Sequence, residues 1–358
     1  MHIIKKVFIE KNQTDNSAVK KFIAEYPTNF EIEIIDSFDN LINNFNFEFD
    51  NRLGKNIIVF KSNKSNFIKK CPCSANIQSC GYYVMNIIQN CYIGCSYCYL
   101  QQYINNNGII IHPNLENIDN ELQILAQKNK IIRLGNGEFS DSLLFDRYTG
   151  ITETLIKKII NYKNIIFEIK SKLTDIEHLL NIDLPHISKK NIVFAWSMNP
   201  QKIIDTEETY ASSLNERINA AKKAVANGYS VAFHFDPVIV FEDWQNEYCQ
   251  VIDLIFSNIP DDKILWISIG AFRCAPELIP IIRKNYPNSR TFLGELIIGI
   301  DGKARYIRIL REKIFKLLVS KIKSYSKNTF VYLCMEPLEL WRAVDCNNPQ
   351  ELNYLITF

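Results

Sequence analysis

The sequence predicts an α/β protein: a partial (β/α)6 TIM-like barrel, a small α/β unit before it, and a hairpin and helix after it. Three observations predict this fold. From about residue 81, apolar strand-like segments alternate with amphipathic helix-like segments six times, which is typical of a parallel sheet with right-handed crossovers. A shorter group of strands around one helix precedes this alternation, and the alternation stops at about residue 291. We therefore divide the chain into an N-terminal unit (1–70), a barrel (71–290) and a C-terminal extension (291–358).

The N-terminal unit is expected to hold three strands and one helix. Its apolar runs are short, and FEIEIID alternates apolar with acidic residues as a half-buried strand does. The strands are expected over 5–10, 30–36 and 55–62, and the helix over 16–26. Residues 62–72 are expected to form a linker to the barrel.

The barrel is expected to consist of six strand–helix units. The strands are expected over 81–88, 130–136, 164–171, 191–199, 230–240 and 263–272. The helices are expected over 115–128, 151–162, 175–182, 213–229, 244–256 and 276–286, with Gly228 ending the fourth. Six units suit an open, partial barrel better than a closed one, and a doubly wound sheet is the alternative.

The C-terminal extension departs from this alternation. Residues 294–309 carry glycines and basic residues typical of a hairpin, and residues 311–325 have a helical pattern. Residues 329–336 form a last apolar strand candidate.

Composition excludes some classes of function. The chain has 358 residues, 47% of them hydrophobic, and a net charge of +2, so global charge gives no case for nucleic-acid binding. We find no pattern of a signal peptide and no apolar run long enough to span a bilayer, so a cytoplasmic protein is expected. Ten cysteines in that compartment suggest metal binding or redox chemistry more than disulfides.

Three cysteines lie within eight residues in CYIGCSYC, at Cys91, Cys95 and Cys98. Three thiolates together suit an iron–sulfur cluster or zinc, but structural zinc takes four protein ligands. A [4Fe–4S] cluster held by three cysteines keeps one iron open, which can chelate the amino and carboxylate groups of S-adenosylmethionine. The alternatives are three buried core thiols, or an iron–sulfur sensor or electron carrier. The spacing C-x3-C-x2-C with Tyr97 between the last two cysteines resembles the radical S-adenosylmethionine superfamily, whose fold is also a partial barrel.

Polar residues follow the expected barrel strands, where active sites of such barrels lie. The segment GNGEFSDS after the second strand resembles the Gly-Gly-Glu segment of the superfamily, which receives the amino group of S-adenosylmethionine. The residues that this resemblance and position suggest for the cofactor are Gly137, Glu138, Ser140, Lys170 or Lys172, Ser197, Asn199 and Arg217. Those suggested for the substrate are His234, Asp236 and Arg273. An ordinary glycine turn, a solvated lysine and a satisfied core histidine are the alternatives.

The segment CSYCYLQ resembles the spore photoproduct lyase family more specifically. Further likenesses are VFIE, HPNLENI, SKL, LNERINAAKKAVANGY, DPVIV and GIDGKARYIRI, so the resemblance covers most of the chain. It implies a lyase that uses a [4Fe–4S] cluster, S-adenosylmethionine and a 5′-deoxyadenosyl radical to reverse a methylene-bridged thymine dimer in DNA. It further implies an electron donor such as flavodoxin or ferredoxin. Tyr97 and Tyr99 would help to relay hydrogen, and Lys303, Arg305 and Tyr306 would lie in the lesion-binding hairpin.

One departure from the family concerns the cysteine that returns hydrogen to the product. The family places it shortly before a Ser-Asp pair, where this chain has Glu138, and a carboxylic O–H is a poor hydrogen-atom donor. Cys274 is the expected substitute and Cys334 the second. The alternative is the same radical chemistry on a different nucleic acid, a peptide or a small molecule. The run GKARYIRILREK suits phosphate and base contacts, or else the solvated face of a helix.

Three more cysteines, Cys71, Cys73 and Cys80, precede the barrel. With Cys334 or Cys346 they suit a second cluster or zinc, and incidental thiols are the alternative.

Overall fold

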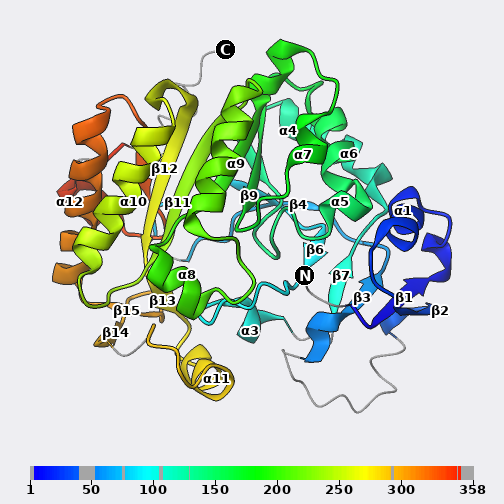
Figure 1. The fold of residues 1–358 in the computed structure, drawn as a ribbon, viewed down its shortest axis with the longest axis horizontal. Coiled ribbons are helices and arrows are strands. Elements are labelled where there is room, and N and C mark those ends of the chain that lie inside the picture. Colours follow the sequence, from blue (N-terminus) through cyan, green and yellow to red (C-terminus); the bar gives the residue numbers. More distant parts are fainter. Residues whose placement is uncertain are drawn as a thin grey trace.

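The computed structural model describes residues 4–39, 53–74, 77–104, 108–128, 130–291, 294–344 and 346–347. The described chain forms a large curled sheet with helices on its outer face, a smaller sheet at one side and a third, short sheet at one end (Figure 1). The α/β fold with a partial barrel is confirmed.

The smaller sheet is built mainly by the N-terminal segment. Its strands run in the order β2-β1-β3-β7-β6 and are parallel except for β6 against β7. They are β1 (Lys6–Glu10), β2 (Glu31–Ile35), β3 (Ile57–Phe60), β7 (Ile109–Ile111) and β6 (Ile88–Gln89). Helix α1 (Ser17–Glu25) begins at Asn16, whose side chain accepts a hydrogen bond from the Ala18 N–H.

The three strands predicted before residue 70 are confirmed, and two strands were missed. β6 and β7 lie beyond residue 70 in sequence, on either side of the three-cysteine loop. Both are too short to show periodicity, and β7 is recognisable only by its pairing with β3. The chain therefore leaves the smaller sheet just before the loop and returns to it at β7, after α3.

The curled sheet contains the six predicted strands in sequence order. They are β5 (Tyr83–Met85), β8 (Ile132–Gly135), β9 (Ile165–Ser171), β10 (Ile192–Ser197), β11 (Ser230–Val238) and β12 (Ile264–Ala271). All pair in parallel, and β10 is buried along its whole length, which explains its continuous apolar sequence.

Two further strands extend this sheet. β16 (Val331–Leu333), predicted as a strand of the C-terminal extension, pairs in parallel with β12. β4 (Ile68–Lys70) pairs antiparallel with β5, so the predicted linker over 62–72 was wrong in this part. The Lys-rich β4 is an edge strand, where exposed charge is common and obscures the strand pattern.

The predicted helices are present between these strands. They are α4 (Ile118–Ala126), α6 (Ile151–Ile159), α7 (Glu177–Leu180), α9 (Leu214–Ala226), α10 (Trp244–Asn258), α11 (Leu278–Asn285) and α12 (Arg308–Tyr325). Shorter helices are α3 (Leu100–Tyr103), α5 (Asp146–Thr149), α8 (Gln201–Glu207) and α13 (Leu338–Ala343).

Helix α9 shows how local sequence sets the boundaries. Ser213 and Glu216 form a capping box at its start. Gly228 adopts φ 86° after its last turn, and Tyr229 N donates to the Ala224 carbonyl, so the predicted glycine end is confirmed.

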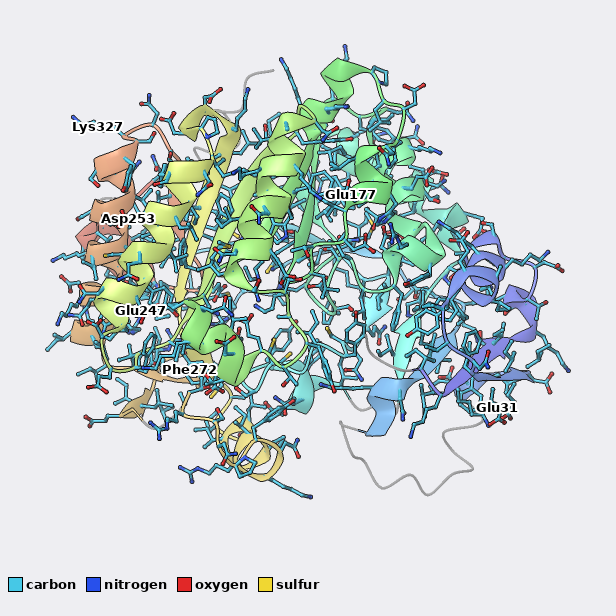
Figure 2. The ribbon with its side chains drawn as sticks, viewed as in Figure 1. Glu31, Glu177, Glu247, Asp253, Phe272 and Lys327 are labelled. Atoms are coloured by element: carbon cyan, nitrogen blue, oxygen red, sulfur yellow. The ribbon has the colours of Figure 1, made fainter. Side chains whose placement is uncertain are left out.

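Helix α10 packs between α9 and α12 on the outside of the barrel. Asp253 of α10 pairs with Lys321 and accepts a hydrogen bond from Tyr325, both on α12. Figure 2 labels Asp253 between the two helices.

The third sheet is the predicted hairpin with one added strand. β14 (Leu296–Ile298) and β15 (Ala304–Tyr306) are antiparallel, and β13 (Arg273–Cys274) pairs with β15. It lies at the end of the barrel that also carries α3 and α8, beyond Phe272, which Figure 2 labels just after β12 (Figures 1 and 2). The carboxyl ends of the barrel strands, the three-cysteine loop and the hairpin thus share one end of the molecule. None of the helices in the described ranges is long and apolar enough to cross a membrane.

Candidate functional site

The three-cysteine loop (residues 91–98) is fixed at its start by Asn90. The Asn90 N–H donates to the Phe139 carbonyl at 2.9 Å, and its carbonyl accepts from Ser140 Oγ at 2.8 Å. The Asn90 side chain donates to the Gly108 carbonyl and accepts from the Cys91 N–H. Asn90 has φ 75°, a left-handed conformation that asparagine tolerates better than most residues. Ser140, predicted to touch a cofactor, therefore ties this loop to the loop after β8.

The other end of the loop is held by two adjacent glutamates at the end of α8. Ser96 N donates to the Glu207 carbonyl at 2.8 Å, and Ser96 Oγ donates to the Glu207 carboxylate. The Tyr97 hydroxyl donates to Glu208, and Cys95 forms a backbone bridge with Glu208. The sequence analysis missed both glutamates, and the only signal available was the Glu-Glu pair itself.

The three loop thiols are free and at least half-buried. Cys95 is buried and the other two are half-buried, and none is in a disulfide. Burial raises the pKa of Cys91 to about 12 and raises the pKa values of Cys95 and Cys98, while each thiol also lies in the field of at least one other. A positively charged centre that takes these free thiols as thiolates suits this donor set.

A site for a single metal ion needs several ligand side chains close to one point. In the ranges that the structure describes, no three His, Cys, Asp or Glu side chains stand close enough to bind one metal ion. The cysteines of a cubane bind different iron corners, so their sulfurs stand farther apart than the ligands of one ion. Three free thiols in one loop are a donor set that suits such a cluster.

A buried ion network lies beneath the loop, centred on Glu208. Its carboxylate pairs with Arg217 and, at 3.4 Å, with Lys172, and accepts from Asn199 Nδ2 at 2.9 Å. Burial alone would raise the pKa of Glu208, but the Lys172 and Arg217 charges and two hydrogen bonds hold it well below its usual range. Tyr97, whose ring Lys172 approaches to 5.6 Å, completes the network.

Four predicted residues, from the ends of β9 and β10 and from α9, thus meet in one place. Lys172, Asn199 and Arg217 converge on Glu208, and Arg217 Nη1 donates to the Ser197 carbonyl at 2.7 Å. Their shared task in this structure is to position the Glu208 carboxylate, which in turn positions Tyr97 and the loop.

The loop after β8 brings backbone close to β9. A Cβ on Gly137 would lie 2.7 Å from both the Lys170 carbonyl and Ser142 Oγ, so no larger residue fits there. The next side chain, Glu138, pairs with Lys170 at 3.2 Å and is partly exposed. Burial opposes the charge of Lys170, yet Glu138, Glu168 and Asp236 hold its pKa well above its usual range. Lys170 is therefore a paired lysine and not a solvated one.

His234 lies inside the barrel with both ring nitrogens engaged. Nε2 is 2.7 Å from Glu168 Oε1 and Nδ1 is 2.6 Å from Ser268 Oγ. Glu168 also accepts hydrogen bonds from Tyr82 and Trp266. Its burial alone would raise its pKa, but His234, the Lys170 charge and the Tyr82 hydrogen bond outweigh burial and lower the pKa to about 2. This geometry matches the alternative stated for His234 in the sequence analysis, a buried histidine whose two ring nitrogens are both hydrogen-bonded.

Asp236, two residues further along β11, is exposed. A Cβ on Gly270 of β12 would lie 2.4 Å from its Oδ1, so Gly270 makes room for this carboxylate.

The hairpin carries its own ion network. Asp301 pairs with Arg305 and, at 3.7 Å, with Arg273, and Glu336 pairs with Arg305 at 3.7 Å and with Arg311. Burial raises the pKa of Glu336 to about 7, although the three arginines act in the opposite direction. Asp301, Arg311 and Glu336 were not singled out from the sequence.

Among the residues predicted to bind a lesion, Arg305 and Tyr306 are buried, and Tyr306 Oη accepts from Val240 N at 3.0 Å. Lys303 and Arg273 are partly exposed. Lys303 and Arg273 thus keep part of their surface accessible, while Arg305 and Tyr306 fix the hairpin on the barrel.

The predicted substitute donor, Cys274, is only 4% exposed and lies opposite Ala304 in the third sheet. Burial raises its pKa to about 11, with Lys303 and Glu277 as its charged neighbours. The predicted relay residue Tyr99 is in contrast exposed, and its hydroxyl donates to the Glu138 carbonyl at 2.7 Å.

Comparisons of this sequence with a family model and with known proteins all point to the same family. The sequence model of the family described as spore photoproduct lyase matches residues 3–330. Spore photoproduct lyase of Clostridium acetobutylicum is 26% identical over 290 residues, which are 78% of this chain and 83% of that protein. Spore photoproduct lyase of Bacillus subtilis is 26% identical over 223 residues, 60% of this chain and 63% of that protein.

Solved structures give the same fold. Spore photoproduct lyase complexed with dinucleoside spore photoproduct superposes with a TM-score of 0.78 at 19% identity, covering 93% of this chain and 99% of that chain. A variant with bound AdoMet and dinucleoside spore photoproduct has a TM-score of 0.79 at 20% identity, with the same coverage.

Proposed function

Because the chain belongs to the spore photoproduct lyase family, we propose that it splits the methylene-bridged thymine dimer of DNA and restores the two thymines. The match over residues 3–330 carries this proposal, since it spans the smaller sheet, the curled sheet except β16, the three-cysteine loop and the hairpin. The relatives carry the lyase name, and solved relatives bind AdoMet and the dinucleoside lesion.

Cys91, Cys95 and Cys98 would hold the [4Fe–4S] cluster, with S-adenosylmethionine at its open iron. When bound, the pair supplies a carbon-centred radical able to take a hydrogen atom from the lesion. Gly137 leaves backbone space beside the loop, and the Glu138 carboxylate lies on the same segment. We assign these two residues to the amino group of the cofactor.

The Glu208 network keeps the loop in one arrangement. Its buried charges are balanced among Glu208, Lys172 and Arg217, so binding need not rearrange them. Asn199 and Tyr97 are held by the same carboxylate. We therefore treat Lys172, Ser197, Asn199, Arg217 and Ser140 as residues that position the loop and the cofactor.

For the lesion, we propose contacts from the partly exposed Lys303 and Arg273 to phosphate and from the exposed Asp236 to a base. His234, Arg305 and Tyr306 would act by positioning these groups. A reductant such as flavodoxin or ferredoxin would supply the electron, and a cytoplasmic location stays a prediction from the sequence.

The test is an anaerobic reaction of the reconstituted enzyme with dithionite, S-adenosylmethionine and DNA that carries the lesion. Mass spectrometry follows restored thymine and 5′-deoxyadenosine. The proposal predicts restored thymine that is absent in a Cys98→Ala variant. Deoxyadenosine without any thymine from the wild-type enzyme would refute the lesion as substrate and direct the search to other nucleic acids, peptides and small molecules.

A further inference from the structure

Helix α11 packs beside the three-cysteine loop. It contacts α3, the short helix that directly follows the loop. Asn285 Nδ2 at the end of α11 donates to Gln101 Oε1 at 3.4 Å, and Gln102 Nε2 donates to Glu277 Oε2 at 3.5 Å. Figure 1 shows α11 and α3 at the end of the molecule that also carries the hairpin. The chain that follows α11 therefore lies at the end of the barrel where the lesion is proposed to bind.

The Glu207 carboxylate joins the segment 289–291, which follows α11, to the three-cysteine loop. Its Oε1 accepts from Arg290 N at 3.1 Å, and its Oε2 accepts from Ser289 Oγ at 2.6 Å and from Thr291 Oγ1 at 2.9 Å. Ser96 Oγ of the loop donates to the same Oε2. Ser96 is 0%, Thr291 1% and Glu207 3% exposed, so water does not compete for these bonds. The backbone of residue 290 is therefore fixed relative to the loop.

The side chain of Arg290 is exposed, although the residues on both sides of it are buried. The groups that donate to Glu207 are three hydroxyls and one backbone N–H, so this carboxylate is satisfied without a guanidinium. Among the residues that the structure describes, Arg290 forms no ion pair with a carboxylate. Its guanidinium is therefore available to an anion in solution.

The surface around Arg290 is basic. Between Glu277 and Glu295 the sequence contains three basic residues, Arg283, Lys284 and Arg290, and no acidic one. All three are exposed, and the first two lie in the last turn of α11. A local excess of positive charge in a chain whose net charge is only +2 favours a polyanion at this place. The DNA backbone is the polyanion that the proposed function supplies.

We propose that Arg290 binds a backbone phosphate of the DNA that flanks the lesion. We further propose that Glu207 is the positioning residue that fixes this contact relative to the three-cysteine loop. The inference rests on the proposed function and adds a phosphate contact to Lys303 and Arg273 on the hairpin side. Phosphate contacts set the register of a protein on DNA without reading its sequence. The contact would thus hold the damaged strand at a fixed distance from the loop.

The first test measures how the reconstituted enzyme binds undamaged duplex DNA, by fluorescence anisotropy over a range of salt concentrations. It compares the wild type with Arg290→Ala and with Lys222→Ala, which removes an exposed positive charge from the outer helix α9. Each phosphate contact contributes about 0.9 to the slope of log affinity against log salt. We expect Arg290→Ala to lower this slope by about 0.9 and to weaken binding roughly 3- to 10-fold, equally on two duplexes of different sequence. Lys222→Ala should bind as the wild type does.

A second test uses repair itself. A dinucleoside lesion has no flanking strand, whereas the same lesion in a duplex has one. In Arg290→Ala we therefore expect the KM for the lesion in a duplex to rise roughly 3- to 10-fold relative to the KM for dinucleoside spore photoproduct.

The role of Glu207 is tested by combining variants. In the Glu207→Gln background the segment 289–291 loses its carboxylate, so we expect Arg290→Ala to weaken DNA binding by roughly 2-fold or less. Thr291→Val keeps the shape of the side chain and removes one donor to Glu207, and it serves the same comparison if circular dichroism shows that Glu207→Gln is unfolded. A purely structural role for Glu207 would lower stability and leave the effect of Arg290→Ala unchanged.

The outcomes separate the inference from the proposed function. A salt slope in Arg290→Ala that equals the wild-type slope, or that falls no more than in Lys222→Ala, would overturn the phosphate contact. An equal effect of Arg290→Ala in the wild type and in the folded Glu207 or Thr291 variant would overturn the positioning role. A wild type that binds DNA through Arg290 but leaves the lesion intact would refute the proposed function and keep the phosphate contact.

Discussion

Replacing Glu208 by Gln removes one negative charge from beneath the three-cysteine loop. The Glu208 and Arg217 side chains are both fully buried, and Lys172 is 14% exposed. The substitution leaves two positive charges without their common partner, which costs about 3–5 kcal/mol in buried pairs. We expect a loss of this size in the free energy of unfolding, measured by urea denaturation of the wild type and the variant.

A matched control is Glu177→Gln, which removes an exposed glutamate labelled in Figure 2. Its partner is Lys223, and the two side chains are 49% and 60% exposed. Exposed pairs contribute about 0–1 kcal/mol, so this variant should unfold almost as the wild type does. Equal stability losses in Glu208→Gln and Glu177→Gln would refute the account of the buried network.

Three further predictions follow from the same geometry. The pKa of Glu168 is lowered to about 2 in the folded protein, against about 4.3 in the unfolded chain, so ionised Glu168 stabilises the fold above about pH 4. This stabilisation should be lost as the pH falls from about 4 towards 2, which an acid titration followed by tryptophan fluorescence can measure. A fluorescence signal that stays flat over that window would contradict the prediction. Gly137→Ala places a Cβ 2.7 Å from the Lys170 carbonyl and should cost about 1–3 kcal/mol in urea denaturation, so a neutral variant would show that this backbone approach is not tight. Asn90→Ala removes two side-chain hydrogen bonds at the start of the three-cysteine loop and should lower the iron retained after gel filtration, whereas wild-type iron content would show that the loop does not need them.

The sequence predicted the barrel well because its strands are buried on both faces and separated by amphipathic helices. It failed where position in the fold decides the structure. β6 and β7 are too short for periodicity, and the basic edge strand β4 resembles a linker. Their pairing across the chain is what makes them strands.

The site shows the same division. The three-cysteine loop and the segment with Gly137 are local patterns, and the sequence displays them directly. Glu207 and Glu208 are acidic residues of a kind that is usually exposed, so only their contacts with Ser96, Tyr97 and Arg217 explain why they are buried.

Long-range contacts also fix the segment that precedes β5. Cys71 N donates to the Tyr82 carbonyl, and Gln78 N donates to the Glu336 carbonyl at the far end of the sheet. The sequence displays neither contact, because each joins residues whose approach depends on the folded sheet.

The most direct test of the three-cysteine loop is the electron paramagnetic resonance spectrum of the reduced, reconstituted enzyme, recorded with and without S-adenosylmethionine and alongside iron analysis. A cluster with one open iron predicts about four irons per chain and a spectrum that changes when S-adenosylmethionine is added. A cluster whose spectrum is indifferent to S-adenosylmethionine, or a protein that takes up no iron at the loop, would contradict the account.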